Sequence, residues 1–413
     1  MTSPPRSDTA RDRILAALAT DESLLVEMRR DLHAHPELSN REAATTRWID
    51  QHLRDLGLSP VRLAAGTGLV CDIPIGMPTS SSPVVALRAD IDALAMQDEK
   101  DVGYRSQADG VAHACGHDVH TTAVIGAARA LVAVAGEAGV SGTVRLVFEP
   151  AEETVPGGAV EILAEHHLDG VLGIFGLHCD PKIDVGHVGT RVGALTSAAD
   201  LVEVTLRGPG GHTARPERTV DLVTLLGRLV TEGQASLDRL TEHSGDLRLV
   251  FGAVHSGDAA NVIPSHGLVR GSLRTPEYDV WLKAPDLFRQ AVQRVLGDTD
   301  AEWEIDHRRG VPPVVNDALM TTVLEAAVHD ALGSAAVVGT DQSWGGDSFA
   351  WYLEGIPGSY ARLGVHDPDS LAPRLDLHAS TFDVDERAIR CGAAVLALSA
   401  LGALRTLTND EPA

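Results

Sequence analysis

Up to about residue 193, short apolar runs of strand length alternate with longer segments whose apolar residues recur at helical spacing. This pattern predicts strands at residues 84–87, 144–148 and 171–177, and helices at residues 123–134 and 158–167. Strands that alternate with helices favour an α/β sheet with right-handed crossovers. We therefore predict an α/β fold for this part of the chain.

The N-terminal segment predicts two further helices. The first ends at about residue 31, because Pro36 disfavours helical geometry in His35 before it. Ser39 and Glu42 stand three residues apart, which is the spacing of a capping box. We expect this box to begin a second helix that continues to about residue 56.

Residues 194–307 follow a different pattern. The segment at 200–207 alternates like a half-exposed strand, and further strands are predicted at 246–254 and 267–273. Helices are predicted at 219–237 and 285–296. After this section the α/β pattern resumes with a predicted helix at 317–332. We predict a small α+β domain at 194–310, inserted into a larger domain formed by residues 1–193 and 311–413.

Composition limits the partners of the chain. It has 34 basic and 58 acidic side chains, a net charge of −24, with 44% hydrophobic residues. This charge argues against a nucleic-acid or anionic-membrane partner, because both need clustered Lys and Arg. The apolar run at 392–404 is too short to span a membrane, and the N-terminus lacks a secretory pattern. Four widely spaced cysteines do not form a disulfide framework, so we expect a cytoplasmic protein.

The first candidate chemistry lies at residues 113–118. Cys115 and His117 are two residues apart at a predicted helix N-terminus, where the helix dipole favours the thiolate that binds metals. Two ligands are not a complete site, and a small buried cysteine beside a capping Asp118 explains the pattern equally well.

Acidic and imidazole side chains follow several of the predicted strands. Glu152 and Glu153 point in different directions, so one carboxylate can bind a metal while its neighbour faces a water. Asp92 and His178 each follow a predicted strand, and His378 follows a proline-containing loop. Taken singly, the acidic pair is more typical of a solvated turn, and His178 of a packed core.

Together these residues change the interpretation. Ends of strands and starts of helices meet in one crevice of an open α/β sheet. The crevice would hold five potential ligands, too many for one tetrahedral ion but suitable for two ions that share a bridging group. The five are Cys115, His117, Glu153, His178 and His378.

The inserted domain has polar candidates of its own. A glycine-rich loop at 208–216 contains His212 but lacks the Gly-Lys-Ser/Thr ending of a phosphate-binding loop. Asn261 adds an amide and Arg274 adds a guanidinium, the usual bidentate partner of a carboxylate. Taken alone, Arg274 is more typical of an exposed strand residue.

At this point the chain resembles the M20 metallopeptidase and aminoacylase family. The resemblance is to its amidohydrolase branch, which includes hippurate hydrolases and plant auxin–amino-acid conjugate hydrolases. The matching motifs keep the family's order and lie at residues 33–38, 88–94, 113–118, 150–153, 176–178, 210–212, 261–264 and 378.

The resemblance implies a zinc-peptidase-like catalytic domain, a mixed sheet flanked by helices, with an inserted ferredoxin-like lid through which two chains form a homodimer. It also implies two divalent ions, with Cys115 as the bridge. His117, Glu153, His178 and His378 would complete the ligand set. Such donors accept Zn²⁺ or Mn²⁺, and also Co²⁺ or Ni²⁺.

The resemblance also implies roles for the remaining residues. Glu152 would be the general base, and Asp92 would orient a neighbouring ligand. His212 would reach the partner subunit's site and stabilise the oxyanion, while Asn261 and Arg274 would hold the substrate.

Three positions depart from the family pattern. Ala95 and Ser380 stand at or near positions where relatives often have proline, and Glu217 stands where they often have histidine. Because Glu217 is close to His212 in sequence, it leaves the identity of the substrate open.

The function that we predict is metal-dependent hydrolysis of N-acyl amino acids to a carboxylic acid and an amino acid. In this hypothesis the ions acidify a water, Glu152 takes its proton, and the same residue protonates the leaving amine. A dipeptidase or carboxypeptidase on the same scaffold is the nearest alternative. An inactive metal-binding module and a metal-independent hydrolase with Cys115 as nucleophile are more remote alternatives.

Overall fold

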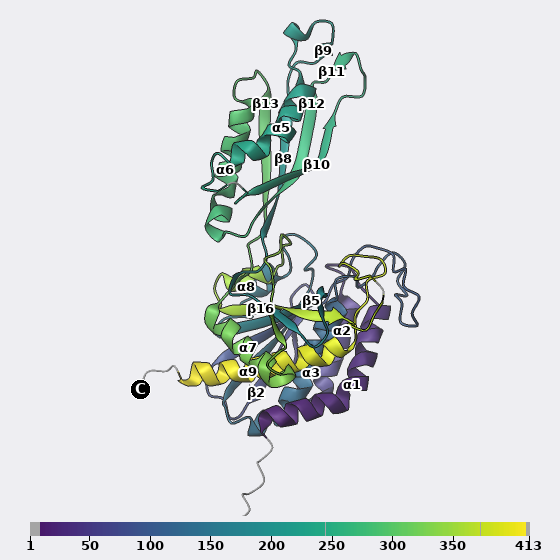
Figure 1. Ribbon diagram of the computed structural model, residues 1–413, viewed down its shortest axis with the longest axis vertical. Helices are drawn as coiled ribbons and strands as arrows, with labels where there is room; N and C mark the ends of the chain where they lie inside the picture. The colour runs from purple at the N-terminus through teal and green to yellow at the C-terminus, as the bar shows by residue number, and fades with distance from the viewer. Residues whose placement is uncertain (1–8, 244, 372, 410–413) are drawn as a thin grey trace, which may run out of the picture. The chain divides into compact units, whose positions relative to one another are not determined.

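The computed structural model describes residues 9–243, 245–371 and 373–409. The chain divides into two compact units (Figure 1). Unit 1 comprises Met1–Gly193, Val315–Asp341 and Trp351–Ala413, and unit 2 comprises Ala194–Val314 and Gln342–Ala350.

Unit 1 is built on a mixed eight-stranded sheet with the order β1-β2-β4-β3-β5-β16-β6-β15. Strand β3 is parallel to both β4 and β5, β16 is parallel to β5, and β2 is antiparallel to β4. The predicted α/β fold is therefore confirmed. The strands are β1 (Val61–Arg62), β2 (Leu69–Ile75), β3 (Val84–Asp90), β4 (Gly142–Glu149), β5 (Val171–Asp184), β6 (Val188–Thr190), β15 (Val337–Gly339) and β16 (Gly358–His366).

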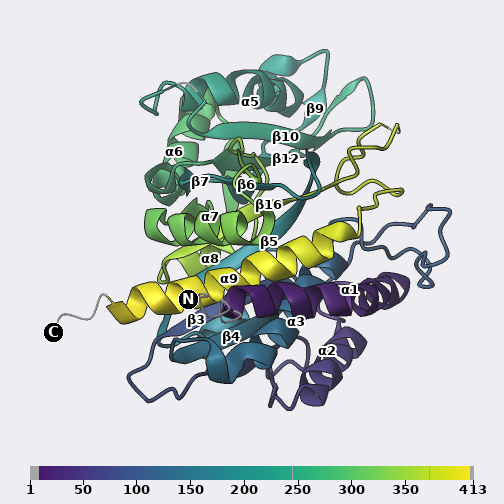
Figure 2. The same ribbon diagram turned by 60° about the horizontal axis from the view of Figure 1, so that its bottom comes forward.

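Helices flank this sheet, and α1, α3 and α9 lie side by side (Figure 2). Glycine allows α3 and α9 to approach closely, because a Cβ at Gly126 would lie 2.9 Å from the Cβ of Ala393. The helices are α1 (Ala10–Ala34), α2 (Ala43–Asp55), α3 (His117–Val134), α4 (Ala159–Ala164), α7 (Ala318–Leu332), α8 (Ala350–Leu353) and α9 (Arg387–Asn409), with a short 3₁₀ turn η1 (Ala135–Glu137) after α3.

Two segments, His117–Glu137 and Arg387–Thr408, are long and apolar enough to cross a membrane by length and composition alone. In each, 72% of the most apolar window is buried inside the protein. They contribute Val124, Leu131, Val395 and Leu401 to the main core. Their apolar character is therefore accounted for by packing in unit 1.

The predicted capping box is wrong, although helix α2 forms. The helix begins at Ala43, and neither Ser39 nor Glu42 caps it with a side-chain hydrogen bond. Instead the Ser39 hydroxyl donates to Asp92 at 2.7 Å, and the Glu42 carboxylate accepts from the backbone N–H of Ala151 at 2.7 Å. Both side chains connect the start of α2 to residues that follow strands of the sheet.

Unit 2 contains a four-stranded antiparallel sheet with the order β10-β12-β8-β13. Helices α5 (Leu222–Leu237) and α6 (Tyr278–Leu296) pack on one face, where Val204, Leu226, Val269 and Phe288 belong to one core. The strands are β8 (Ala198–Arg207), β10 (Arg248–Ser256), β12 (His266–Thr275) and β13 (Glu302–Val311). A separate two-stranded antiparallel sheet is formed by β9 (Gly211–His212) and β11 (Val262–Ile263).

Helix α6 begins earlier than the predicted start at residue 285. A proline fits best in the first turn of a helix, where its missing N–H costs nothing. The structure places Pro285 inside the helix, which starts at Tyr278. Buried Trp281, Ala284 and Phe288 supply the packing that favours this longer helix.

Candidate metal centre

A tight turn before α3 presents Cys115 and His117 together. Gly116 between them has φ +87°, a left-handed conformation that glycine adopts without strain. A Cβ at this position would lie 2.7 Å from the sulfur of Cys179. Glycine is therefore required here both by the backbone conformation and by the packing.

Strand β5 supplies His178 from its interior. The sequence predicted a strand that ends just before this residue, but β5 continues to Asp184, so that expectation is wrong. His178 Nδ1 donates to the backbone carbonyl of Cys179 at 2.7 Å. This bond leaves Nε2 as an acceptor, which lies 3.5 Å from the sulfur of Cys115.

The two remaining predicted ligands, Glu153 and His378, also lie close to Cys115. His378 Nε2 lies 3.3 Å from the Cys115 sulfur and 3.3 Å from Glu153 Oε1. His378 has φ +62°, and its backbone N–H donates to the carbonyl of Ala114 at 2.8 Å. That hydrogen bond holds the histidine-bearing loop beside the Cys115 turn.

The structure thus brings all five predicted ligands together within unit 1. The ligand atoms of Cys115, His117 and His178 lie within 4.8 Å of one another, and so do those of Cys115, Glu153 and His378. Cys115 belongs to both groups. This sharing is the arrangement expected of two ions joined by one bridging ligand.

Asp92 contacts members of both groups. Its carboxylate lies 3.2 Å from His117 Nδ1 and accepts from the backbone N–H of Glu153 at 3.0 Å. Although burial raises the pKa of Asp92, its hydrogen bond with His117 and the histidine's charge hold that pKa below the usual range. A carboxylate that fixes the far nitrogen of a ligating histidine is a recurrent feature of metal sites.

Unsatisfied polar atoms test whether this site suits metal ions. His117 Nε2 and Glu153 Oε1 are buried and have no hydrogen-bond partner among the described residues. Buried polar atoms without partners are rare, and a cation would satisfy both. Thiolate, imidazole and carboxylate donors also suit divalent transition metals, so the residues present fit two such ions.

In the absence of metal, burial disfavours the thiolate form of Cys115, contrary to the prediction from the sequence. The side chain is 6% exposed, and burial raises the pKa of the thiol well above its usual value despite the opposing effect of His117. The predicted preference for thiolate at the helix N-terminus is therefore wrong for this environment alone. A bound cation favours the thiolate, because a metal-ligating cysteine is deprotonated.

A buried network of charged side chains lies next to the candidate ligands, and it was not predicted from the sequence. Arg88 donates to Glu149 at 2.7 Å and to Asp90 at 2.6 Å. His120 accepts from the backbone N–H of Cys179, so its Nδ1 carries the proton shared with Asp90 at 2.6 Å. The sequence does contain a sign of this network. Arg88 and Asp90 occupy alternate positions of an otherwise apolar strand, so their side chains leave the same face.

Glu152 lies beside Glu153 in the turn that follows β4. Its carboxylate belongs to a third close group, with His117 and Glu153. The residue is partly exposed. Glu152 is therefore within reach of both the candidate metal ligands and solvent.

The other predicted residues belong to unit 2. His212 in β9 pairs with Val262 of β11, and Thr213 donates its backbone N–H to the Asn261 carbonyl at 3.2 Å. Arg274 lies near the end of β12 and donates to the backbone carbonyl of Trp344 at 2.6 Å. Glu217 lies in a short 3₁₀ turn, η2 (Pro216–Arg218).

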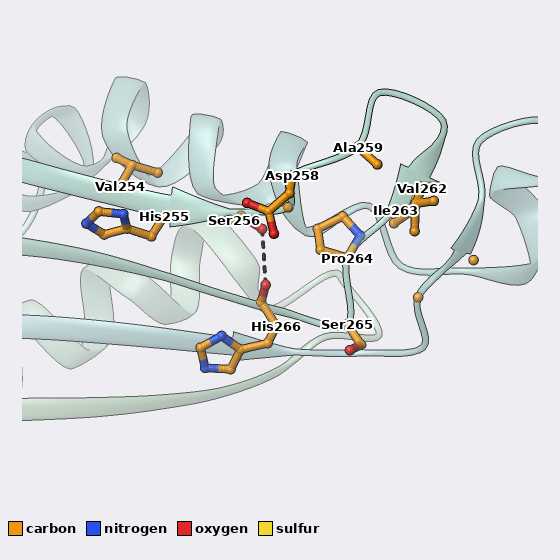
Figure 3. Close-up of a pocket in the computed structure, with 13 residues that line it drawn as sticks. Val254, His255, Ser256, Asp258, Ala259, Val262, Ile263, Pro264, Ser265 and His266 are labelled. Carbon is orange, nitrogen blue, oxygen red and sulfur yellow. Dashed lines mark hydrogen bonds between the residues drawn. The ribbon is translucent and has the colours of Figure 1, made fainter.

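A hollow of about 880 Å³ adjoins the two-stranded sheet of β9 and β11 (Figure 3). It is lined by residues of that sheet, of the adjacent ends of β10 and β12, and of the segment between these strands, among them His255, Asp258, Pro264 and His266. None of the five candidate metal ligands lines it. The hollow is therefore not the candidate metal centre, despite its large volume.

Comparison with known proteins agrees with this fold. The model of peptidase family M20/M25/M40 matches residues 86–401. The chain belongs to this family, and it is a metal-dependent hydrolase of amide bonds.

Individual relatives share most of the chain. An N-acetyl-L-cysteine deacetylase from Bacillus subtilis is 35% identical over 372 residues, 90% of this chain and 86% of that protein. A Rhodococcus jostii protein that carries the name of a glutamate–cysteine ligase is 44% identical over 95% of this chain. The chain spans about half of that protein's length, 48%.

One solved structure matches most of the chain. The Bacillus subtilis YXEP protein, described as a dinuclear metal-binding peptidase of the M20 family, superposes with a TM-score of 0.81 at 31% identity. The match covers 94% of this chain and 99% of that one.

Proposed function

We propose that the protein hydrolyses the amide bond of N-acyl amino acids with the help of two divalent ions, Zn²⁺ or Mn²⁺, held by Cys115, His117, Glu153, His178 and His378. The observation that carries this proposal is the position of Cys115 in two ligand groups at once, with Glu152 beside them. Divalent ions in such a site would polarise the amide carbonyl and lower the pKa of a water.

The side chains around the site divide the remaining work. Glu152 takes a proton from the attacking water and gives it to the leaving amine, a role that suits its partly exposed carboxylate. Asp92 keeps His117 in one orientation through their contact at 3.2 Å. His212 donates to the developing oxyanion, and Asn261 and Arg274 hold the substrate.

The distances inside unit 2 support a homodimer. His212 belongs to β9, which lies with β11 beyond the start of β12 (Figure 1). Arg274 lies near the other end of β12. From residue 266 to residue 274 an extended strand covers about 26 Å. An N-acyl amino acid is much shorter, so one substrate can contact both residues only if they come from two chains.

The names of relatives guide the choice of substrates. Two Bacillus subtilis relatives, 35% and 34% identical, are named as deacetylases of N-acetylcysteine. Two Saccharolobus solfataricus relatives, 31% identical, are named as thermostable carboxypeptidases, which keeps peptide cleavage as the second candidate. The described cysteines are free and buried, which suits a reducing compartment such as the cytoplasm.

Glu152→Gln tests the reaction. We expect metal content to be unchanged and kcat to fall by roughly 10²- to 10⁴-fold, because the proton carrier is lost while the proposed ligands remain. The measurement combines metal analysis with hydrolysis of N-acetylcysteine, N-benzoylglycine and a dipeptide.

Two outcomes would contradict the proposal. A Glu152→Gln enzyme that keeps most of its activity would remove Glu152 from the proton transfers. Cleavage of the dipeptide without any cleavage of acyl amino acids would favour a peptidase instead.

A further inference from the structure

Two arginines face each other across strands of unit 2 without an acidic partner. Arg248 in β10 and Arg274 in β12 are register partners, so their side chains leave the same face of the sheet. Their neighbours Leu249 and Leu273 point to the opposite face, into the core under the helices. The arginine pair therefore lies on the face that α5 and α6 do not cover.

Trp344 holds both guanidinium groups in place. The Arg248 guanidinium lies over the indole ring at 3.6 Å from its centroid, and Arg274 donates to the Trp344 backbone carbonyl at 2.6 Å. Trp344 is half-buried and reaches this position because Ser343 and Gly345 hydrogen-bond to Leu195 and Ser197, just before β8. The three side chains form what we term the Arg248–Arg274–Trp344 cluster.

Other arginines on this face have acidic partners. Arg270 donates to Glu203, and Arg308 donates to Asp306 at 2.8 Å. Arg248 and Arg274 form no ion pair with a carboxylate in the described part of the chain, and burial alone lowers the pKa of Arg274. In a chain with a net charge of −24, two unpaired guanidinium groups side by side stand out.

The two guanidinium groups of this cluster lack an anionic partner among the residues that the structure describes. Two like charges directly opposite in an antiparallel pair repel, and a partly desolvated guanidinium without a counter-ion is unfavourable. A cation–π stack occupies only the flat face of Arg248 and leaves its in-plane N–H donors open. Each guanidinium can therefore still receive one carboxylate in a bidentate manner.

We propose that the Arg248–Arg274–Trp344 cluster is a dicarboxylate-binding site that selects N-acyl derivatives of acidic amino acids. Arg274 receives the α-carboxylate and Arg248 receives the side-chain carboxylate. This inference rests on the proposed amide hydrolysis and adds Arg248 and Trp344 as specificity determinants. Arg248 is a binding residue in this proposal and takes no part in the proton transfers.

The test compares N-acetyl-L-glutamate with N-acetyl-L-glutamine, which differ only in replacing a carboxylate by a neutral amide. The metal-loaded wild-type enzyme is expected to prefer the glutamate derivative in kcat/KM by roughly 10- to 100-fold, the size of a charge-assisted contact. Arg248→Gln should lower that ratio to near unity by raising KM for the glutamate derivative. Arg248→Lys, which keeps the charge but loses the planar fork, should give an intermediate ratio.

Arg308→Gln is the matched control, because Arg308 is an exposed arginine on the same face that is already paired with Asp306. It should leave the ratio unchanged. Titration calorimetry with free L-glutamate and L-glutamine should show the same preference in wild type and its loss in Arg248→Gln.

The outcomes separate this inference from the proposed hydrolysis. If the enzyme cleaves N-acyl amino acids but Arg248→Gln and wild type share one glutamate-to-glutamine ratio, the dicarboxylate site is wrong while the hydrolysis stands. A wild-type enzyme without a preference for the glutamate derivative would also overturn it. If no acyl amino acid is cleaved, the proposed function fails, and calorimetry still decides whether the cluster binds a dicarboxylate.

Discussion

Glu42 connects the start of α2 to the turn that carries Glu152 and Glu153. Its carboxylate accepts from the backbone N–H groups of Ala151 and Asn40. Burial raises the pKa of Glu42 to about 7 from 4.5, so the folded protein favours the protonated acid. The protonated Glu42 therefore contributes to the free energy of unfolding. This contribution is fully present below about pH 4.5 and is lost as the pH rises through about 7.

We therefore expect Glu42→Gln to change the pH dependence of folding. Between about pH 5 and pH 8 the wild-type free energy of unfolding should fall relative to that of the variant by up to roughly 3 kcal/mol. Urea unfolding of both metal-free proteins across this range measures the difference. Parallel pH profiles for the two proteins would show that Glu42 does not titrate in this way.

The candidate ligands could be predicted from the sequence because residues 113–118, 150–153 and 176–178 each place a donor beside a predicted strand or helix end. The protonation state of Cys115 could not, because its thiol is controlled by burial, which depends on the tertiary structure. The contact between Arg248 and Trp344 could not be predicted either, because the two residues lie far apart in the sequence.

The start of α3 is the element on which the centre depends most. Gly116→Ala would force a side chain into a left-handed conformation and against the sulfur of Cys179. We expect a loss of about 1–3 kcal/mol in the free energy of unfolding, together with weaker metal binding. Denaturant unfolding and titration with a competing chelator measure the two effects.

Gly136→Ala is the control for this prediction. Gly136 lies in η1, just after α3, and a Cβ there would meet no heavy atom within 4 Å. This variant should keep wild-type stability and metal affinity. Equal losses in the two glycine variants would contradict the specific role of the Gly116 turn.

At the level of elements, periodicity predicted the helices α3, α5 and α7 and the strands β3, β4, β8 and β12, although their ends differ by several residues. Periodicity failed where contacts with other parts of the chain determine the ends of an element or the partners of a side chain. Strand β5 continues through polar Asp180 and Lys182 because it pairs with β16 along most of that length. Ser39 and Glu42 satisfy groups outside their own helix.

For the whole molecule, the proposed homodimer predicts complementation between inactive chains. Glu152→Gln lacks the base, and His212→Ala lacks the residue proposed to act in the partner's site. In mixed dimers one site combines an intact Glu152 with an intact His212, so re-associated mixtures should recover up to roughly a quarter of wild-type activity.

Glu152→Gln mixed with Cys115→Ser is the control, because both substitutions lie in unit 1 and no mixed site would be complete. This mixture should stay inactive. A Glu152→Gln and His212→Ala mixture that also stays inactive, while forming dimers, would place His212 in its own chain's site or outside catalysis.

The central claim is that two divalent ions share Cys115 and are required for amide hydrolysis. Its most direct test strips the enzyme with a chelator, restores Zn²⁺ or Mn²⁺ stepwise, and follows bound metal and hydrolysis of an acyl amino acid together. The account predicts that activity disappears with the metal and returns as occupancy approaches about two ions per chain. Full activity in the metal-free protein, or full activity with a single bound ion, would contradict it.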